Sequence, residues 1–261
     1  SERGVMDAAC GGGVATKSRV AVVALCWGLL ALFGNSAAMA GPPFQTDDPD
    51  PVPFRHFEMY AFGLSDSTTT GGTTLAFPSY ELNYGVAPNV QLHMVVPVVA
   101  SLPPSGGTAH YGIGDTELGA KIRFLKETKR LPEVGIFPFV ELPSGSAAKG
   151  LGVGATWYRL PLWIQKSWGP WTSYGGGGET IVPVEGARNF PFAGLLVQRQ
   201  INKKLTLGSE LFGHGAMAAD SGSSTMRDGG GFYEVKEGCD VLLAAGHSIA
   251  GQAETYAYLA L

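Results

Sequence analysis

The sequence lacks any apolar run long enough for a membrane-spanning helix, and it is poor in charge and in cysteine. Its longest uncharged apolar run, residues 20–33, is shorter than the roughly 20 residues that such a helix needs. Charged residues make up 15% of the chain and give a net charge of −4, which argues against a nucleic-acid-binding protein because these usually carry a basic excess. Of three cysteines, only Cys239 follows the N-terminal leader, so we expect no internal disulfide in an exported chain.

The N-terminal region carries the pattern of a secretory signal peptide. Lys17 and Arg19 precede the apolar run, which is followed by small residues and ends in the A-x-A sequence Ala38-Met39-Ala40. This pattern predicts a signal peptide over residues 1–40, with an upstream extension over residues 1–16 and cleavage after Ala40. A short membrane anchor is the alternative interpretation.

Alternating side chains dominate the rest of the chain. In the stretch YGIGDTELGAKIRF, residues 111–124, charged residues fall on one parity and apolar residues on the other. Successive side chains of a strand point to opposite faces, so this stretch predicts a strand with one charged and one apolar face. The chain is also rich in glycine, with 38 residues, and 10% of its residues are aromatic. This composition fits an outer-membrane β-barrel and also a secreted β-sandwich.

Strand-like runs separated by turns continue to the C-terminus, with almost no helical periodicity. They predict twelve strands, at residues 54–64, 76–85, 89–100, 112–126, 133–142, 154–167, 170–182, 190–200, 204–214, 229–237, 239–247 and 253–261. Short connections such as VAPN, SWGP, INKK and KEG alternate with long polar ones such as SDSTTTGGTT and GHGAMAADSGSSTMRDG. An even strand number with short turns at one end is typical of bacterial outer-membrane barrels. We therefore predict an all-β fold, an antiparallel transmembrane β-barrel of about twelve strands over residues 54–261.

The segment that precedes the first strand, GPPFQTDDPDPVP at residues 41–53, is rich in proline and aspartate. Proline disfavours both helices and interior strands, so we expect an extended periplasmic segment. Its acidic cluster Asp47, Asp48 and Asp50 is interpreted as solvated, with a cation site as the alternative.

The charged parity of the strands supplies the candidate site residues. In a membrane barrel the apolar face contacts lipid and the polar face lines the lumen, so Leu118, Ile122 and Phe124 should face lipid. The residues expected to line the lumen and to set selectivity by pairing are Glu58, Glu81, Asp115, Glu117, Lys121, Arg123, Glu141, Arg159 and Glu210.

No motif predicts catalysis, a cofactor or a metal. GHSIAG, residues 246–251, has an alanine at the last position of the nucleophile elbow G-x-S-x-G and no later histidine, which disfavours Ser248 as a nucleophile. The histidines lack metal-ligand spacing. His93 is interpreted as a hydrogen-bonding lumen residue, with an acid–base role as the alternative.

Several long motifs resemble the bacterial MetA-pathway of phenol degradation family. They are GPPFQTDDPDPV, ELNYGVAPNVQLHMVVPV, YGIGDTELGAKIRF, VGIFPFVELPSG, LPLWIQKSWGPWTSYGGGG and LTLGSELF, between about residues 41 and 215. The resemblance implies an outer-membrane β-barrel described as a transporter and implies no catalytic residues. The chain ends in Leu261, not in the terminal aromatic residue common in such barrels.

These observations together predict a monomeric channel in the outer membrane of a Gram-negative bacterium. Its partners would be outer-membrane lipid and a small solute, aromatic or apolar, that passes passively, and it would not be an enzyme. Two alternatives remain: a structural barrel plugged by its own lumen charges, and an outer-membrane hydrolase.

Overall fold

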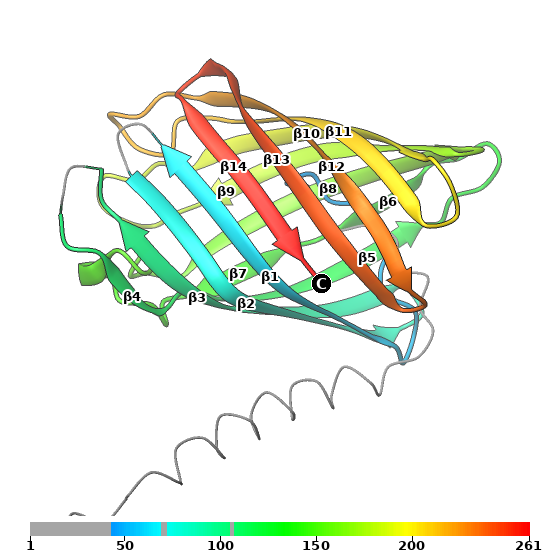
Figure 1. Ribbon diagram of the computed structural model, residues 1–261, viewed down its shortest axis with the longest axis horizontal. Coiled ribbons are helices and arrows are strands. Elements are labelled where there is room, and N and C mark those ends of the chain that lie inside the picture. The colour runs from blue at the N-terminus through cyan, green and yellow to red at the C-terminus, as the bar shows by residue number, and fades with distance from the viewer. Residues whose placement is uncertain (1–42, 69–71, 105–106) are drawn as a thin grey trace, which may run out of the picture. The chain divides into compact units, whose positions relative to one another are not determined.

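The computed structural model describes residues 43–68, 72–104 and 107–261 (Figure 1). The predicted signal peptide, its cleavage site after Ala40, and Cys10 and Cys26 lie outside the described residues. No helix in the described ranges is long and apolar enough to cross a membrane.

Strands make up most of the described chain. They are β1 (Phe57–Thr68), β2 (Gly72–Ala87), β3 (Val90–Leu102), β4 (His110–Ile113), β5 (Thr116–Leu125), β6 (Glu133–Ile136), β7 (Phe139–Leu142), β8 (Trp157–Trp168), β9 (Trp171–Ile181), β10 (Phe190–Gln200), β11 (Leu205–His214), β12 (Ser224–Lys236), β13 (Cys239–Gly251) and β14 (Glu254–Ala260). A single turn of 3₁₀ helix, η1 (Ala147–Lys149), lies between β7 and β8.

The fourteen segments form one closed antiparallel barrel of twelve strands, because two of the strands are interrupted. Segments β4 and β5 both pair with β3, and segments β6 and β7 both pair with β8. The ring closes where β1 pairs with β14, a seam visible at the front of Figure 1. The predicted fold class and strand number are confirmed, and a β-sandwich is excluded because a single sheet closes on itself.

The predicted alternation is present in the barrel wall. In β5, Lys121 points inward and is 3% exposed, whereas Phe124 points outward and is 62% exposed. On several other strands the outward side chains are large and apolar, each between 42 and 59% exposed: Leu160, Leu162, Ile164, Leu195, Val197, Leu207, Leu211, Leu243 and Leu259. So large an exposed apolar surface is unfavourable in water and matches the lipid-facing band of a membrane barrel.

The connections differ from the predicted strict alternation of lengths. Short turns join β2 to β3, β8 to β9, and β12 to β13, as predicted. The tract SDSTTTGGTT does not form a long loop, because β1 and β2 extend through it and only residues 69–71 lie between them. Threonine favours strands, and here Ser67 Oγ lies 2.8 Å from Thr73 Oγ1 across the pair. Strand β12 likewise begins at Ser224, earlier than residue 229.

The interior of the barrel is packed along one side. A cluster of buried side chains contributed mainly by β9 to β14 and β1 includes Tyr174, Leu196 and Tyr256. Phe44, which precedes all strands, belongs to the same cluster. The N-terminal segment therefore lies inside the barrel.

Candidate functional site

The N-terminal segment, residues 43–53, crosses the lumen without forming a helix or a strand. At one end, the Glu210 carboxylate of β11 accepts hydrogen bonds from the backbone N–H groups of Gln45, at 3.1 Å, and Thr46. At the other end, Val52 N–H donates to the Gln91 side chain of β3 at 2.8 Å. The segment has no neighbouring strand to pair with, so these barrel side chains accept the hydrogen bonds of its backbone N–H groups.

Close contact with the wall fixes the segment in place. Gly194 of β10 lies against it, and a Cβ there would come within 1.9 Å of Thr46 Oγ1. A Cβ at Gly85 of β2 would come within 2.1 Å of the Pro53 carbonyl oxygen. Glycine at these two positions lets the N-terminal segment approach the wall.

This arrangement corrects the expectation of a solvated periplasmic segment over residues 41–53. The described part contains a turn and bends and forms no helix or strand, and Thr46 and Asp48 are fully buried. Lumen cations attract the acidic cluster inward, since Lys121 would otherwise be buried without a counter-charge and Arg123 would be left with Glu133. The cation-site alternative gains no support, because no group of three potential metal ligands occurs among the described residues.

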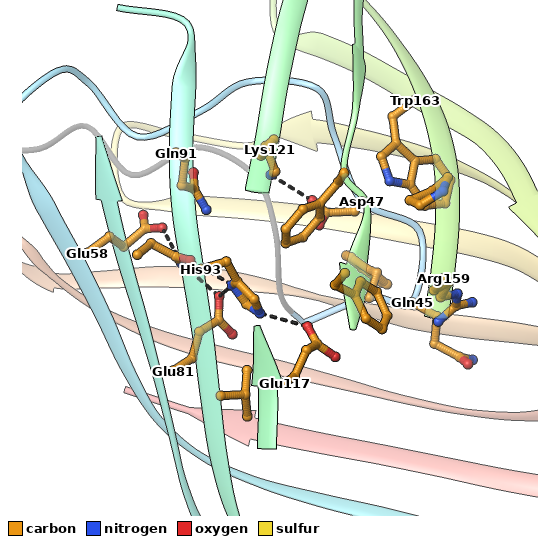
Figure 2. A pocket seen from close by; sticks show the side chains of 16 residues that line it. Gln45, Asp47, Glu58, Glu81, Gln91, His93, Glu117, Lys121, Arg159 and Trp163 are labelled. Atoms are coloured by element: carbon orange, nitrogen blue, oxygen red, sulfur yellow. Dashed lines mark hydrogen bonds and ion pairs between the residues drawn. The ribbon is translucent and has the colours of Figure 1, made fainter. Parts of the chain in front are cut away.

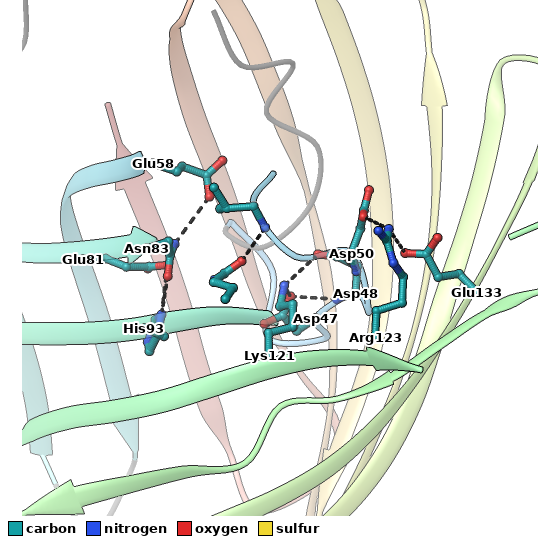
Figure 3. Close-up of polar contacts among 12 residues, drawn as sticks. Asp47, Asp48, Asp50, Glu58, Glu81, Asn83, His93, Lys121, Arg123 and Glu133 are labelled. Atoms are coloured by element: carbon teal, nitrogen blue, oxygen red, sulfur yellow. Dashed lines mark hydrogen bonds and ion pairs between the residues drawn. The ribbon is translucent and has the colours of Figure 1, made fainter. Parts of the chain in front are cut away.

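Lys121 holds the centre of the segment. Its Nζ lies 3.0 Å from Asp47 Oδ1 and 3.3 Å from Asp48 Oδ2 (Figure 3). Burial raises the pKa of Asp48 well above its usual range, and the charge of Asp47 adds to the rise against the charge of Lys121. Burial also acts to raise the pKa of Asp47, but the charge of Lys121 and the hydrogen bonds outweigh it, so that this pKa is lowered. Asp47 is therefore the main counter-charge of Lys121.

Arg123 forms the neighbouring anchor. Its guanidinium contacts Asp50 of the segment and lies 3.2 Å from Glu133 of β6 (Figure 3). It also donates to the Asn89 side chain at the turn between β2 and β3. Asp50 and Glu133 were not predicted as site residues, although acidic residues near a buried arginine are its natural partners.

A hydrogen-bond network covers the facing wall. His93 Nδ1 lies 2.7 Å from Asn83 Oδ1, and His93 Nε2 lies 2.7 Å from Glu117 Oε1 (Figure 2). The Asn83 amide donates to Glu81 at 2.7 Å and to Glu58 at 3.4 Å. Three predicted lumen residues thus meet around His93, whose two ring nitrogens are both engaged, as expected for a hydrogen-bonding role.

The remaining predicted residues have separate surroundings. Asp115, between β4 and β5, accepts from Gly145 N–H at 2.9 Å and Val153 N–H at 2.7 Å, and so organises the loop between β7 and β8. Glu210 binds the N-terminal segment. Arg159 of β8 packs on aromatic rings, and Glu141 of β7 lies near it without an ion pair among the described residues.

A cavity of about 200 Å³ lies between the segment and the wall. Its lining combines the polar network around His93 with Phe137, Phe139, Pro161 and Trp163. Phe137 meets the His93 ring edge-on, with 5.0 Å between ring centres, and Trp163 and Arg159 both lie against Phe192 (Figure 2). An apolar cavity of about 150 Å³ holds one benzene molecule. The space therefore admits a molecule with a single ring.

Ser248 and His214 do not form a nucleophile–base pair in the described part of the chain. Ser248 Oγ accepts from Glu254 N–H at 3.0 Å. The nearby His214 bonds Glu254 through Nε2, at 3.0 Å, and the Gly215 carbonyl through Nδ1, at 2.8 Å. Both imidazole nitrogens are committed, so His214 is not placed to take the serine proton.

Comparison with known proteins supports the fold. No family model and no curated protein matches the chain. Among solved structures, the chain is similar to the COG4313 outer membrane channel from Pseudomonas putida F1, with a TM-score of 0.66 and 14% identity over 85% of this chain and 98% of that one. A loop-deletion mutant of the outer membrane protein OmpT of Vibrio cholerae aligns with a TM-score of 0.32 and 11% identity over 78% of this chain and 98% of that one. At such identities, the first likeness shows the fold alone.

Proposed function

We propose that the chain is a channel in the bacterial outer membrane that lets small solutes pass passively. The observation that carries the proposal is a closed barrel with an apolar outer surface and a polar lumen that contains a cavity. A closed sheet leaves no unpaired edge in lipid, which is what a spanning sheet requires. The similar solved structure is described as an outer membrane channel, which supports the same assignment.

The size of the passage sets the class of solute. Barrels of about eight strands fill with side chains, and those of sixteen or more strands leave a wide aqueous channel. Twelve strands with a segment across the lumen leave room for one small molecule at a time. We propose single-ring aromatic or small apolar solutes, in agreement with the aromatic side of the cavity and with the resemblance to the MetA-pathway of phenol degradation family.

Permeation of reconstituted protein tests the proposal. The full chain in liposomes should admit small neutral solutes and exclude large sugars, and it should give small conductance steps in planar bilayers. A variant that lacks residues 43–53 should conduct more, because the segment crosses the lumen. A folded full-length barrel that passes neither ions nor small aromatics would contradict a channel.

A plugged structural barrel is the second candidate, and the anchoring of the segment favours it. Lys121, Arg123 and Glu210 all bind the segment from the wall. If these contacts never open, the lumen stays closed and the barrel acts only as a structural element. The same conductance measurement separates the candidates, since only a channel conducts with the segment present.

A further inference from the structure

Arg159 is the one basic residue lining the cavity for which the described structure provides no acidic partner. Its guanidinium carbon lies 3.8 Å from the centre of the Phe192 ring, and 6.0 and 5.7 Å from the ring centres of Phe139 and Phe212. It makes no ion pair with any described residue, and its Nε is buried without a hydrogen-bond partner in this part of the chain. Lys121, the other basic residue of the cavity, binds two aspartates.

Nearby carboxylates do not satisfy Arg159. Glu117 lines the same cavity but accepts a hydrogen bond from His93 at 2.7 Å. Glu141 lies diagonally across the β7–β8 pair, since Phe139 is opposite Arg159 and Glu141 is opposite Trp157. The guanidinium packs on Phe192 instead of pairing with this carboxylate.

Trp163 provides a second uncommitted donor on the same wall. It shares the inward face of β8 with Arg159, and its ring centre lies 6.1 Å from that of Phe192. Its Nε1 is buried with no hydrogen-bond partner among the described residues. Arginine and tryptophan side chains can only donate, and buried donors rarely stay unpaired. A ligand that carries hydrogen-bond acceptors would satisfy both Arg159 and Trp163.

We infer that this wall is a binding subsite for a small aromatic carboxylate. The carboxylate accepts hydrogen bonds from the planar guanidinium of Arg159, which matches its geometry. The ring lies in the cavity against Phe137 and Trp163, where about 200 Å³ accommodates one ring. A phosphate would bring further oxygens, beyond the donors that Arg159 and Trp163 offer on this wall. The inference rests on the proposed function, because the ligand reaches the subsite through the lumen.

Benzoate and its neutral isostere benzamide form the test pair. Calorimetric titration of the full chain, folded in detergent, should show benzoate binding at least about tenfold more tightly than benzamide, since charge-assisted hydrogen bonds are roughly twice as strong as neutral ones. Arg159→Gln should abolish this preference. Arg199→Gln is the matched control, because Arg199 also stacks on an aromatic ring, 5.2 Å from the centre of Trp171, but is exposed on the wall. It should leave benzoate binding unchanged.

Two further variants guard against loss of folding. Arg159→Lys keeps the charge and should retain a reduced preference for benzoate, and Trp163→Phe keeps the ring and should weaken benzoate binding about threefold, the effect of one neutral hydrogen bond. Equal affinity of the wild type for benzoate and benzamide would overturn the inference, as would undiminished benzoate binding by folded Arg159→Gln or Arg159→Lys. If neutral solutes permeate but benzoate is not preferred, the subsite is rejected and the proposed channel function stands. If benzoate binds but no solute permeates, the channel function is rejected and the subsite stands.

Discussion

Lys121 Nζ lies 3.0 Å from Asp47 Oδ1, and this pair joins the barrel wall to the segment that crosses its lumen. Lys121 is 3% exposed and comes from β5, whereas Asp47 comes from the chain before β1. Removal of one partner from a buried ion pair costs about 3–5 kcal/mol, because the other charge is left uncompensated. The position of the segment therefore depends on this contact.

The two aspartates beside Lys121 should not be equivalent. Asp47→Asn removes the main counter-charge and should release the segment, whereas Asp48→Asn replaces a carboxyl whose pKa is already raised and should have a smaller effect. Protease cleavage within residues 43–53 of the folded barrel measures release. If protease cleaves the two variants at the same rate, the two aspartates contribute equally to holding the segment.

The same pair predicts a pH dependence. The pKa of Asp47 is lowered in the folded protein, so its stabilising effect is present above the ordinary aspartate range and is lost as the pH falls through the lowered value. Asp48 has a raised pKa and acts in the opposite sense, so protonation of Asp48 favours the buried segment. Protection of the segment should therefore persist through the ordinary aspartate range and fall only at lower pH. In Asp47→Asn this low-pH loss should be absent.

The lumen charges should set ion preference. The double variant Lys121→Gln, Arg123→Gln removes two positive charges from a lumen whose wall also carries Glu58, Glu81 and Glu117. It should shift selectivity toward cations, because rings of charged side chains determine which ions pass. Reversal potentials in a salt gradient measure this shift. Lys203→Gln with Lys204→Gln, in the turn between β10 and β11, removes the same charge outside the lumen and should change the potential little. A similar shift in both double variants would mean that the lumen pairs do not control selectivity.

The outer face should not tolerate charge in mid-strand. Leu162→Arg, near the middle of β8 on the apolar surface, should lower the free energy of unfolding in lipid by about 2–4 kcal/mol if it lies at the midplane. Leu131→Arg provides the control, because Leu131 has a similar exposure, 49% against 42%, but lies in the turn between β5 and β6. Denaturant titrations in lipid vesicles measure both. Equal costs would place Leu162 outside the hydrocarbon region.

Asp115 should stabilise the loop between β7 and β8 and have little part in permeation. Asp115→Ala removes the acceptor of two backbone N–H groups, those of Gly145 and Val153. Each N–H group left unpaired should destabilise the loop by about 1–3 kcal/mol. Faster proteolysis within residues 143–156 should accompany an unchanged ion selectivity. Altered selectivity with an intact loop would instead place Asp115 in the permeation path.

Sequence patterns predicted the wall far better than the contents of the barrel. The alternation in residues 111–124 placed Lys121 and Phe124 on opposite faces, because successive side chains of a strand point to opposite sides. Which residues pair across the lumen depends on register and closure, which local patterns do not determine. Composition suggested a solvated segment at residues 41–53. The predicted lumen positions of Lys121 and Arg123, however, already indicated that acidic residues would be needed inside the barrel to balance their charge. Arg159 was predicted as a lumen residue, but its aromatic surroundings come from strands distant in sequence.

The segment inside the lumen also constrains how the molecule assembles. Ring closure joins β1 to β14, the last strand, whereas the segment directly precedes β1. Its contacts with Gln91, Lys121 and Arg123 can form on the wall made by β2 to β6 before the C-terminal strands arrive. The later strands can then close around a segment already in place, so no free end has to be threaded through a finished ring. Residues 43–53 would thus be in place before the ring closes.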